Sequence, residues 1–201
     1  MARARLIAAV VGLAALAAPR AALAHATNTG FGPFYDGLAH LFVTPEDLLT
    51  VVAVTLLAAL HGKAAGRRAV VTLPAAWLVG MGAGTALGVP PGLGWVMLLL
   101  MIVLGLLVAM DRRLSVTTVS SLAVLAGVLH GYGNGAAGAE ARLGALFVAG
   151  IACGVFVLVT LVGGHVVSLR ASWSRVAVRV AGSWITAIGL LMLGWTARGG
   201  A

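Results

Sequence analysis

Six long apolar segments, separated by short polar or basic stretches, follow one another through most of the chain. Each is close to the ~20 apolar residues that a helix needs to cross the hydrocarbon core of a bilayer. Only helices satisfy every backbone hydrogen bond within one such segment. The pattern therefore predicts an all-α fold, a polytopic membrane helix bundle with six transmembrane helices, at residues 46–64, 69–88, 93–110, 116–133, 143–166 and 176–197.

A further apolar run at the N-terminus has the flanks of a secretory signal. Arg3 and Arg5 precede the run at 6–18, and Ala22-Leu23-Ala24 supplies the small-x-small pattern that signal peptidase accepts. The run is short for a span, although an uncleaved first helix remains the alternative. We expect a cleaved signal peptide (1–24), a periplasmic or interfacial segment (25–45) and a six-helix transmembrane domain (46–201).

The composition is that of a protein embedded in lipid. Hydrophobic residues make up 61% of the chain and charged residues only 9%, against roughly 25% charged residues in an average soluble domain. The net charge of +8 is spread in small groups between apolar segments, with no basic run interleaved with aromatics. We therefore expect membrane lipid as a partner and no nucleic acid. Cys153 is the only cysteine, so no disulfide forms within one chain.

The basic residues also predict the orientation, because loops rich in Lys and Arg stay cytoplasmic. The opposite side of the mature chain holds only Arg142 and Arg198. We expect a multi-pass protein of the bacterial inner membrane with both mature termini periplasmic. The loops after the first, third and fifth spans hold eight basic residues, at positions 63, 67, 68, 112, 113, 170, 175 and 179.

Histidines and carboxylates fall at two depths in this topology. Ionisable residues inside membrane segments are costly and usually face the bundle interior or a water-filled path. Imidazole nitrogen with carboxylate oxygen suits borderline divalent ions such as nickel, cobalt or zinc. For a single histidine, an interhelical hydrogen bond or an interfacial anchor is the alternative. We expect an outer metal site with His40, Glu46, Asp47 and His130, an inner relay of His61 and His165, and an entrance formed by His25, Asp36 and Glu140.

The segment ahead of the first span has two local signals. Pro45 is typical of the first turn of a helix, with Thr44 as its N-cap. The preceding Gly30 to Phe42 is rich in aromatic residues and predicts an interfacial or re-entrant piece over the outer mouth.

Three longer motifs resemble a known family. They are GLAHLFVTPEDLL (37–49), LHGYGNGAAGAE (129–140) and RVAGSWITAIGLL (179–191), and they follow the expected signal peptide, which ends Ala-Leu-Ala-His. Together they resemble the HupE/UreJ family of hydrogenase and urease accessory membrane proteins across nearly the whole chain. The resemblance implies six helices and nickel uptake for metalloenzyme assembly, with a homo-oligomer or metalloenzyme-maturation proteins as candidate partners.

The chain departs from the family pattern at ligand positions. The second motif, His-Gly-x-Ala-His-Gly, keeps His130 and Gly131 but has Asn134 where the second histidine is expected. Asn134 therefore joins the expected outer site, and two nitrogen ligands become oxygen ligands. In the first motif, His-Pro-x-x-Gly-x-Asp-His, His40 matches, and Leu41, Thr44, Glu46 and Asp47 stand where Pro, Gly, Asp and His are expected.

These features predict a secondary permease or facilitator for a divalent transition-metal cation, nickel-like, with cobalt or zinc as alternatives. No ATP-binding motif is present, and neither an enzyme activity nor an organic cofactor is expected. One alternative is a b-type haem subunit in which His61 and His165 ligate iron, which a Soret band would reveal. The other is a non-catalytic assembly subunit of a membrane complex.

The predicted topology is testable by cysteine-accessibility labelling. We expect Arg67, Arg112 and Arg175 to face the cytoplasm and Glu140 to face the periplasm with both mature termini, because the basic residues divide eight to two. A membrane-impermeant thiol reagent applied from outside should label a cysteine placed at position 140 and spare one placed at position 67. Labelling at position 67 would overturn the orientation.

Overall fold

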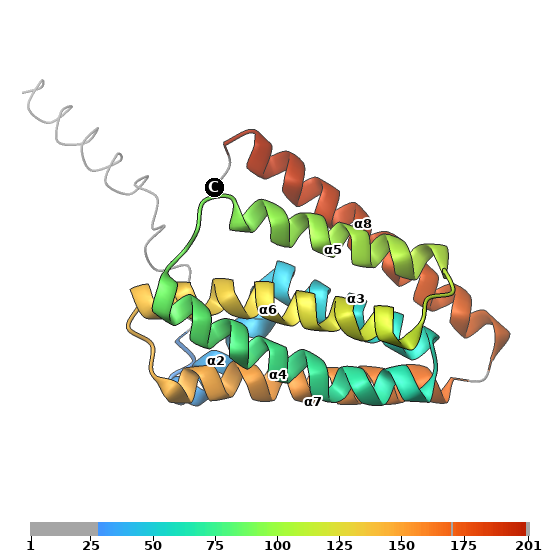
Figure 1. The fold of residues 1–201 in the computed structure, drawn as a ribbon, viewed down its shortest axis with the longest axis horizontal. Helices are drawn as coiled ribbons and strands as arrows, with labels where there is room; N and C mark the ends of the chain where they lie inside the picture. The colour runs from blue at the N-terminus through green and yellow to red at the C-terminus, as the bar shows by residue number, and fades with distance from the viewer. Residues whose placement is uncertain (1–27, 170, 200–201) are drawn as a thin grey trace, which may run out of the picture.

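The computed structural model describes residues 28–169 and 171–199, which form seven helices and, within those ranges, no strand (Figure 1). The predicted all-α membrane bundle is confirmed. The proposed signal peptide, His25 and Arg170 lie outside the described residues. The helices are α2 (Pro33–Val43), α3 (Pro45–Leu60), α4 (Lys63–Leu87), α5 (Leu93–Met110), α6 (Val116–Glu140), α7 (Ala145–Ser168) and α8 (Ser172–Ala197).

Five of these helices, α4 to α8, are long and apolar enough to cross a membrane. The first predicted span is different, because α3 has 16 residues and is therefore about 24 Å long, shorter than a ~30 Å hydrocarbon core. The helices α2 and α3 meet at Thr44 with a bend of 75°, and only together do they pass as a sixth span. The segment expected to be interfacial or re-entrant is α2, and the bent pair of α2 and α3 has the geometry of a broken span or of a re-entrant loop.

Helix α3 lies at the centre of the bundle and contacts each of the other six helices. Ten of its 16 residues are buried. The most extensive helix pairs surround it: α4 with α6, α5 with α8, and α2 with α7. In Figure 1, α5 and α8 form one side of the bundle and α4, α6 and α7 the other. Of its polar residues, Asp47, Thr50 and Thr55 are therefore buried inside the protein, whereas Glu46 is half-buried.

Glycines bring the backbones of α4 and α6 into direct contact. A Cβ atom added to Gly84 would lie 2.0 Å from the carbonyl oxygen of Tyr132, and one added to Gly131 would lie 2.1 Å from that of Trp77. Gly135 approaches the carbonyl oxygen of Met81 equally closely. Small residues permit this approach between helices in lipid. The sequence-based end of the fourth span at 133 was wrong: the glycine-rich stretch is helical to Glu140 because these contacts bury it.

Two helices with basic residues near their N-termini begin earlier in the chain than the sequence predicted. Helix α4 starts at Lys63 and α8 at Ser172, whereas the spans were expected to begin at 69 and 176. Arg67 and Arg68 therefore lie within α4, and Arg175 and Arg179 within α8, rather than in loops.

The α4–α6 contact predicts a strong asymmetry between two glycines of the same helix. Gly84→Ala should lower the midpoint of thermal unfolding in detergent, because the new methyl group meets a backbone carbonyl and overpacking typically costs about 1–3 kcal/mol. Gly82→Ala is the matched control, since no atom lies within 4 Å of a Cβ there. Equal unfolding midpoints for the two variants would contradict the close contact.

Candidate functional site

A buried carboxylate joins α3 to α6 near the break between α2 and α3. Asp47 lies in the first turn of α3 and is 2% exposed. Its Oδ1 lies 2.7 Å from Nδ1 of His130, and its Oδ2 accepts a hydrogen bond of 2.7 Å from Nδ2 of Asn134. His130 and Asn134 are one turn apart on α6 and present their polar groups to the same carboxylate. The first turn of a helix is also where its dipole favours a negative charge.

The hydrogen-bonding partners fix the chemistry of each group. Nδ1 of His130 donates to the carboxylate, which leaves Nε2 as the remaining nitrogen, and this atom is buried without a partner among the described residues. Nδ2 of Asn134 also donates to the backbone oxygen of His130 at 2.9 Å. Both neighbours of Nδ2 are acceptors, so the amide must take this orientation. Its Oδ1 is then a buried acceptor without a partner in the described part of the chain.

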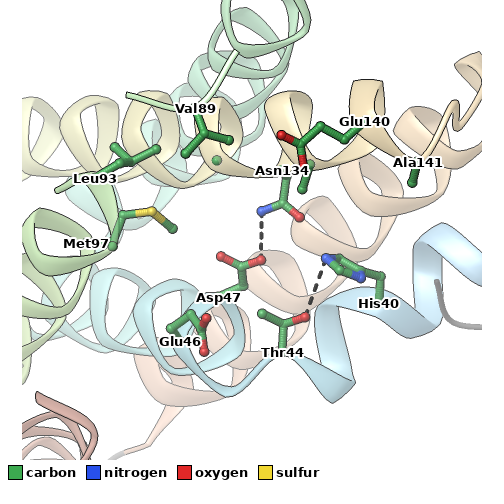
Figure 2. Close-up of a pocket in the computed structure, with 13 residues that line it drawn as sticks. His40, Thr44, Glu46, Asp47, Val89, Leu93, Met97, Asn134, Glu140 and Ala141 are labelled. Carbon is green, nitrogen blue, oxygen red and sulfur yellow. Dashed lines mark hydrogen bonds between the residues drawn. The ribbon is translucent and has the colours of Figure 1, made fainter. Parts of the chain in front are cut away.

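A cavity of about 550 Å³ opens beside Asp47 and Asn134 (Figure 2). The cavity is polar on the side of α2, α3 and the end of α6, and apolar on the side of α5. At about 30 Å³ per water molecule, it has room for a hydrated ion. Its lining comprises His40, Thr44, Glu46, Asp47, Val89, Leu93, Gly94, Met97, Gly133, Asn134, Ala137, Glu140 and Ala141.

Three carboxylates and no Lys or Arg line this cavity: Glu46, Asp47 and Glu140. A concave surface of one charge sign with apolar walls focuses the field and concentrates counter-ions, here cations. Yet within residues 28–169 and 171–199 no three His, Cys, Asp or Glu side chains converge closely enough to hold a metal ion.

The other residues expected at the outer level have separate places. His40 lines the cavity from α2, and its Nε2 lies 3.4 Å from the hydroxyl of Thr44. Thr44 is the N-cap residue of α3, as predicted, but its side chain does not cap the helix. Asp36 accepts hydrogen bonds from the backbone N–H and hydroxyl of Thr29 and does not line the cavity. Of the expected entrance residues, only Glu140 does so, and His25 lies outside the described residues.

His130 does not line the cavity either. It is fully buried behind Asp47, with its ring centroid 5.8 Å from that of Trp77. The structure thus groups His40, Glu46, Asp47 and Asn134 around the cavity, and holds His130 against Asp47 from inside. A histidine that donates to a carboxylate from this position orients the carboxylate and polarises it.

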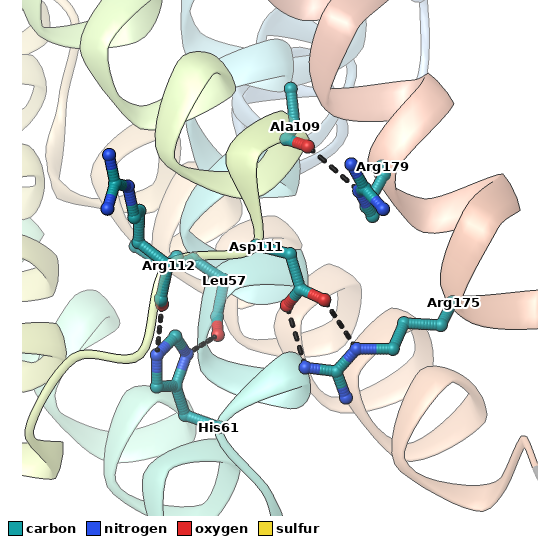
Figure 3. Close-up of polar contacts among 7 residues, drawn as sticks. All are labelled: Leu57, His61, Ala109, Asp111, Arg112, Arg175 and Arg179. Atoms are coloured by element: carbon teal, nitrogen blue, oxygen red, sulfur yellow. Dashed lines mark hydrogen bonds and ion pairs between the residues drawn. The ribbon is translucent and has the colours of Figure 1, made fainter.

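The two histidines of the predicted inner relay lie near the other end of the bundle. Both ring nitrogens of His61 contact backbone atoms: Nδ1 lies 2.7 Å from the oxygen of Leu57, and Nε2 lies 3.0 Å from the oxygen of Arg112 (Figure 3). The backbone nitrogen of Leu114 also donates to Nε2 at 2.9 Å. His165 is exposed on α7, and no hydrogen bond joins it to His61 in the described residues. This arrangement gives the haem alternative no support.

Sequence reasoning missed the apolar residues of the site. Leu93 and Met97 line the cavity from α5, but nothing distinguishes them from other apolar residues of the third span. Trp77, which no motif of the sequence singled out, is fully buried with its ring against His130. The signal for Trp77 was its position in the middle of a span, away from the interfaces where tryptophan gathers.

Comparison with known proteins identifies the family. Residues 13–192 match the profile described as HupE / UreJ protein. The chain belongs to the HupE/UreJ family. This family is associated with nickel and cobalt transport for hydrogenase and urease. No match was found among curated proteins or among solved structures.

The buried cluster of this HupE/UreJ member predicts that Asp47 stabilises the fold. Asp47→Ala should lower the midpoint of thermal unfolding of the metal-free protein in detergent, because it removes the acceptor for buried donors of His130 and Asn134. Each buried polar group left unsatisfied typically costs about 1–3 kcal/mol of stability. Glu46→Ala should change the midpoint little, since Glu46 makes no hydrogen bond or ion pair within the described residues. If Glu46→Ala lowered the midpoint as much as Asp47→Ala, the structural role of the cluster would be wrong.

Proposed function

We propose that this chain is a secondary permease or facilitator that moves a divalent transition-metal cation, nickel-like, across the inner membrane for metalloenzyme assembly. One observation carries the proposal. Three carboxylates line a cavity, and the most buried of them, that of Asp47, lies at the break between α2 and α3. Broken helices place uncapped helix ends beside substrate ions in many secondary transporters. Membership of the HupE/UreJ family agrees with a metal cargo.

The cavity residues have different proposed roles. Glu46 and Glu140 raise the concentration of cations in the cavity through their charge. Asp47 is the deepest carboxylate, and it replaces part of the water shell of the ion. His40 and Oδ1 of Asn134 add neutral ligands, so the donor set mixes nitrogen with oxygen, as borderline divalent ions accept. His130 acts on the ion through Asp47, by holding the carboxylate in position.

Weak binding is consistent with transport. Passage requires that an ion enter a site favourably and also leave it. A closed cage of three or more side chains would retain the ion, and the described residues contain no such cage. From the cavity, α3 leads inward from Asp47 to His61, fourteen residues or about 21 Å along one helix face. His61 and His165 are the proposed relay at that end.

The uptake experiment compares variants of the cluster in cells at matched membrane levels. Asp47→Asn and His130→Ala should each reduce uptake of the transported metal about tenfold or more, the usual cost of disturbing a ligand or its supporting partner. Asp36→Asn removes a charge outside the cavity and should have a smaller effect than Asp47→Asn. Unchanged uptake of nickel, cobalt, zinc and manganese in both cluster variants would eliminate the site and favour the haem or assembly-subunit alternatives.

The same assay tests the choice of metal. Asn134→His adds an imidazole at the position where the family motif has histidine, and it should shift the relative uptake toward nickel or other metals that favour nitrogen ligands. Asn134→Gln, which keeps an amide, is the matched control for altered packing. An identical metal profile in wild type and Asn134→His would exclude Asn134 from the ligand set.

A further inference from the structure

A second cavity, of about 220 Å³, lies at the end of the bundle opposite the outer cavity. It is enclosed by the turn between α3 and α4, the last turn of α7 and the first turns of α8. Its polar residues are Gly62, Lys63, Ser174 and Arg175, and its apolar ones are Ala59, Leu60, Val166, Val167, Leu169 and Val178. None of these residues belongs to the proposed cation site.

The charge around this cavity is positive. Lys63 is exposed and has no carboxylate partner among the described residues. Arg175 binds Asp111 through Nε, at 2.5 Å, and Nη2, at 2.7 Å (Figure 3). Its Nη1 donates no hydrogen bond within the described part of the chain. Asp111 is the only acidic residue at this end, against seven basic residues that the structure describes: Lys63, Arg67, Arg68, Arg112, Arg113, Arg175 and Arg179.

Backbone groups add to this positive potential. Helices α4 and α8 both begin beside the cavity, with 25 and 26 residues, and neither has a side-chain cap at its N-terminus. The first N–H groups of a helix lack partners within the helix, and the helix dipole adds a partial positive charge there. Gly62, with φ of 90°, turns the chain sharply at the start of α4. Two helix N-termini and two cationic side chains therefore surround one cavity.

We propose that this cavity binds the phosphate group of an anionic phospholipid, and that Lys63 is its principal contact. Basic pockets between membrane helices on the face rich in Lys and Arg bind such head groups. The apolar lining decides between a lipid and a free anion, because Leu60, Val166 and Val167 offer an acyl chain a surface that inorganic phosphate does not use. The inference is independent of the metal cargo.

The test measures lipid retained by the purified full-length protein in native mass spectrometry, after detergent exchange with phosphatidylglycerol. Wild type should retain phosphatidylglycerol in preference to phosphatidylcholine. Lys63→Gln should weaken retention about fivefold, the loss expected for one basic residue at a membrane surface. Arg67→Gln is the matched control, since Arg67 is one turn along the same helix, equally charged, exposed and not part of the cavity. Lys63→Arg should restore retention and so exclude misfolding as the cause.

Three results would overturn the proposal. Equal losses in Lys63→Gln and Arg67→Gln would mean that lipid gathers around the basic rim without a specific site. Equal retention of phosphatidylcholine would mean adsorption through acyl chains alone. Displacement of phosphatidylglycerol by inorganic phosphate would assign the cavity to a small anion. Metal uptake enters none of these measurements, so a failure here is distinct from a failure of the proposed function.

Discussion

The end of the bundle that holds the larger cavity depends on burying one carboxylate, that of Asp47, among the helices. An ionised carboxylate is costly to bury without partners, because it loses its hydration. Donors from His130 and Asn134, together with the N-terminal end of α3, offset that cost. Asn134 is in position only if α6 remains helical beyond residue 133, and α6 does so because its glycines pack on the backbone of α4. The burial of Asp47 thus depends on the length of α6, and the length of α6 depends on its glycine contacts with α4.

Hydropathy predicted the long apolar helices. It did not predict the helix boundaries that depend on packing between helices. The stretch from Gly131 to Gly138 has the composition of a loop, and helix propensity alone would leave it unfolded. Its partner, the backbone of α4 around Trp77 and Met81, lies some fifty residues away in sequence, so no local pattern revealed it. The sequence also did not reveal that α3 is one part of a bent helix pair. Thr44-Pro45 marked the start of α3 correctly, but no local pattern gives the angle between α2 and α3.

The sequence predicted the polar residues of the candidate site, but not which of them line the cavity and which lie behind it. Assigning depths from the topology placed His40, Asp47 and His130 at one level, and all three lie near one another at the helix break. Depth alone does not state which side chain faces the cavity and which stands behind it. In the structure His130 lies behind Asp47, whereas Asn134, suggested only by the family motif, lines the cavity, and its buried Oδ1 has no partner among the described residues. Leu93 and Met97, which complete the wall, carry no polar signal.

The contact between α4 and α6 also limits how this protein changes shape. The backbones touch at Gly84, Gly131 and Gly135 with no layer of side chains between them, so α4 and α6 form one closely packed unit. Asn134 and Glu140 belong to that unit. The remaining walls of the outer cavity come from α2, α3 and α5. Glycines pack α2 just as closely on α7, where a Cβ on Gly37 would lie 2.0 Å from the carbonyl oxygen of Phe147. In the proposed transporter, a change in the width of the cavity would therefore require these tightly packed helix pairs to move relative to one another.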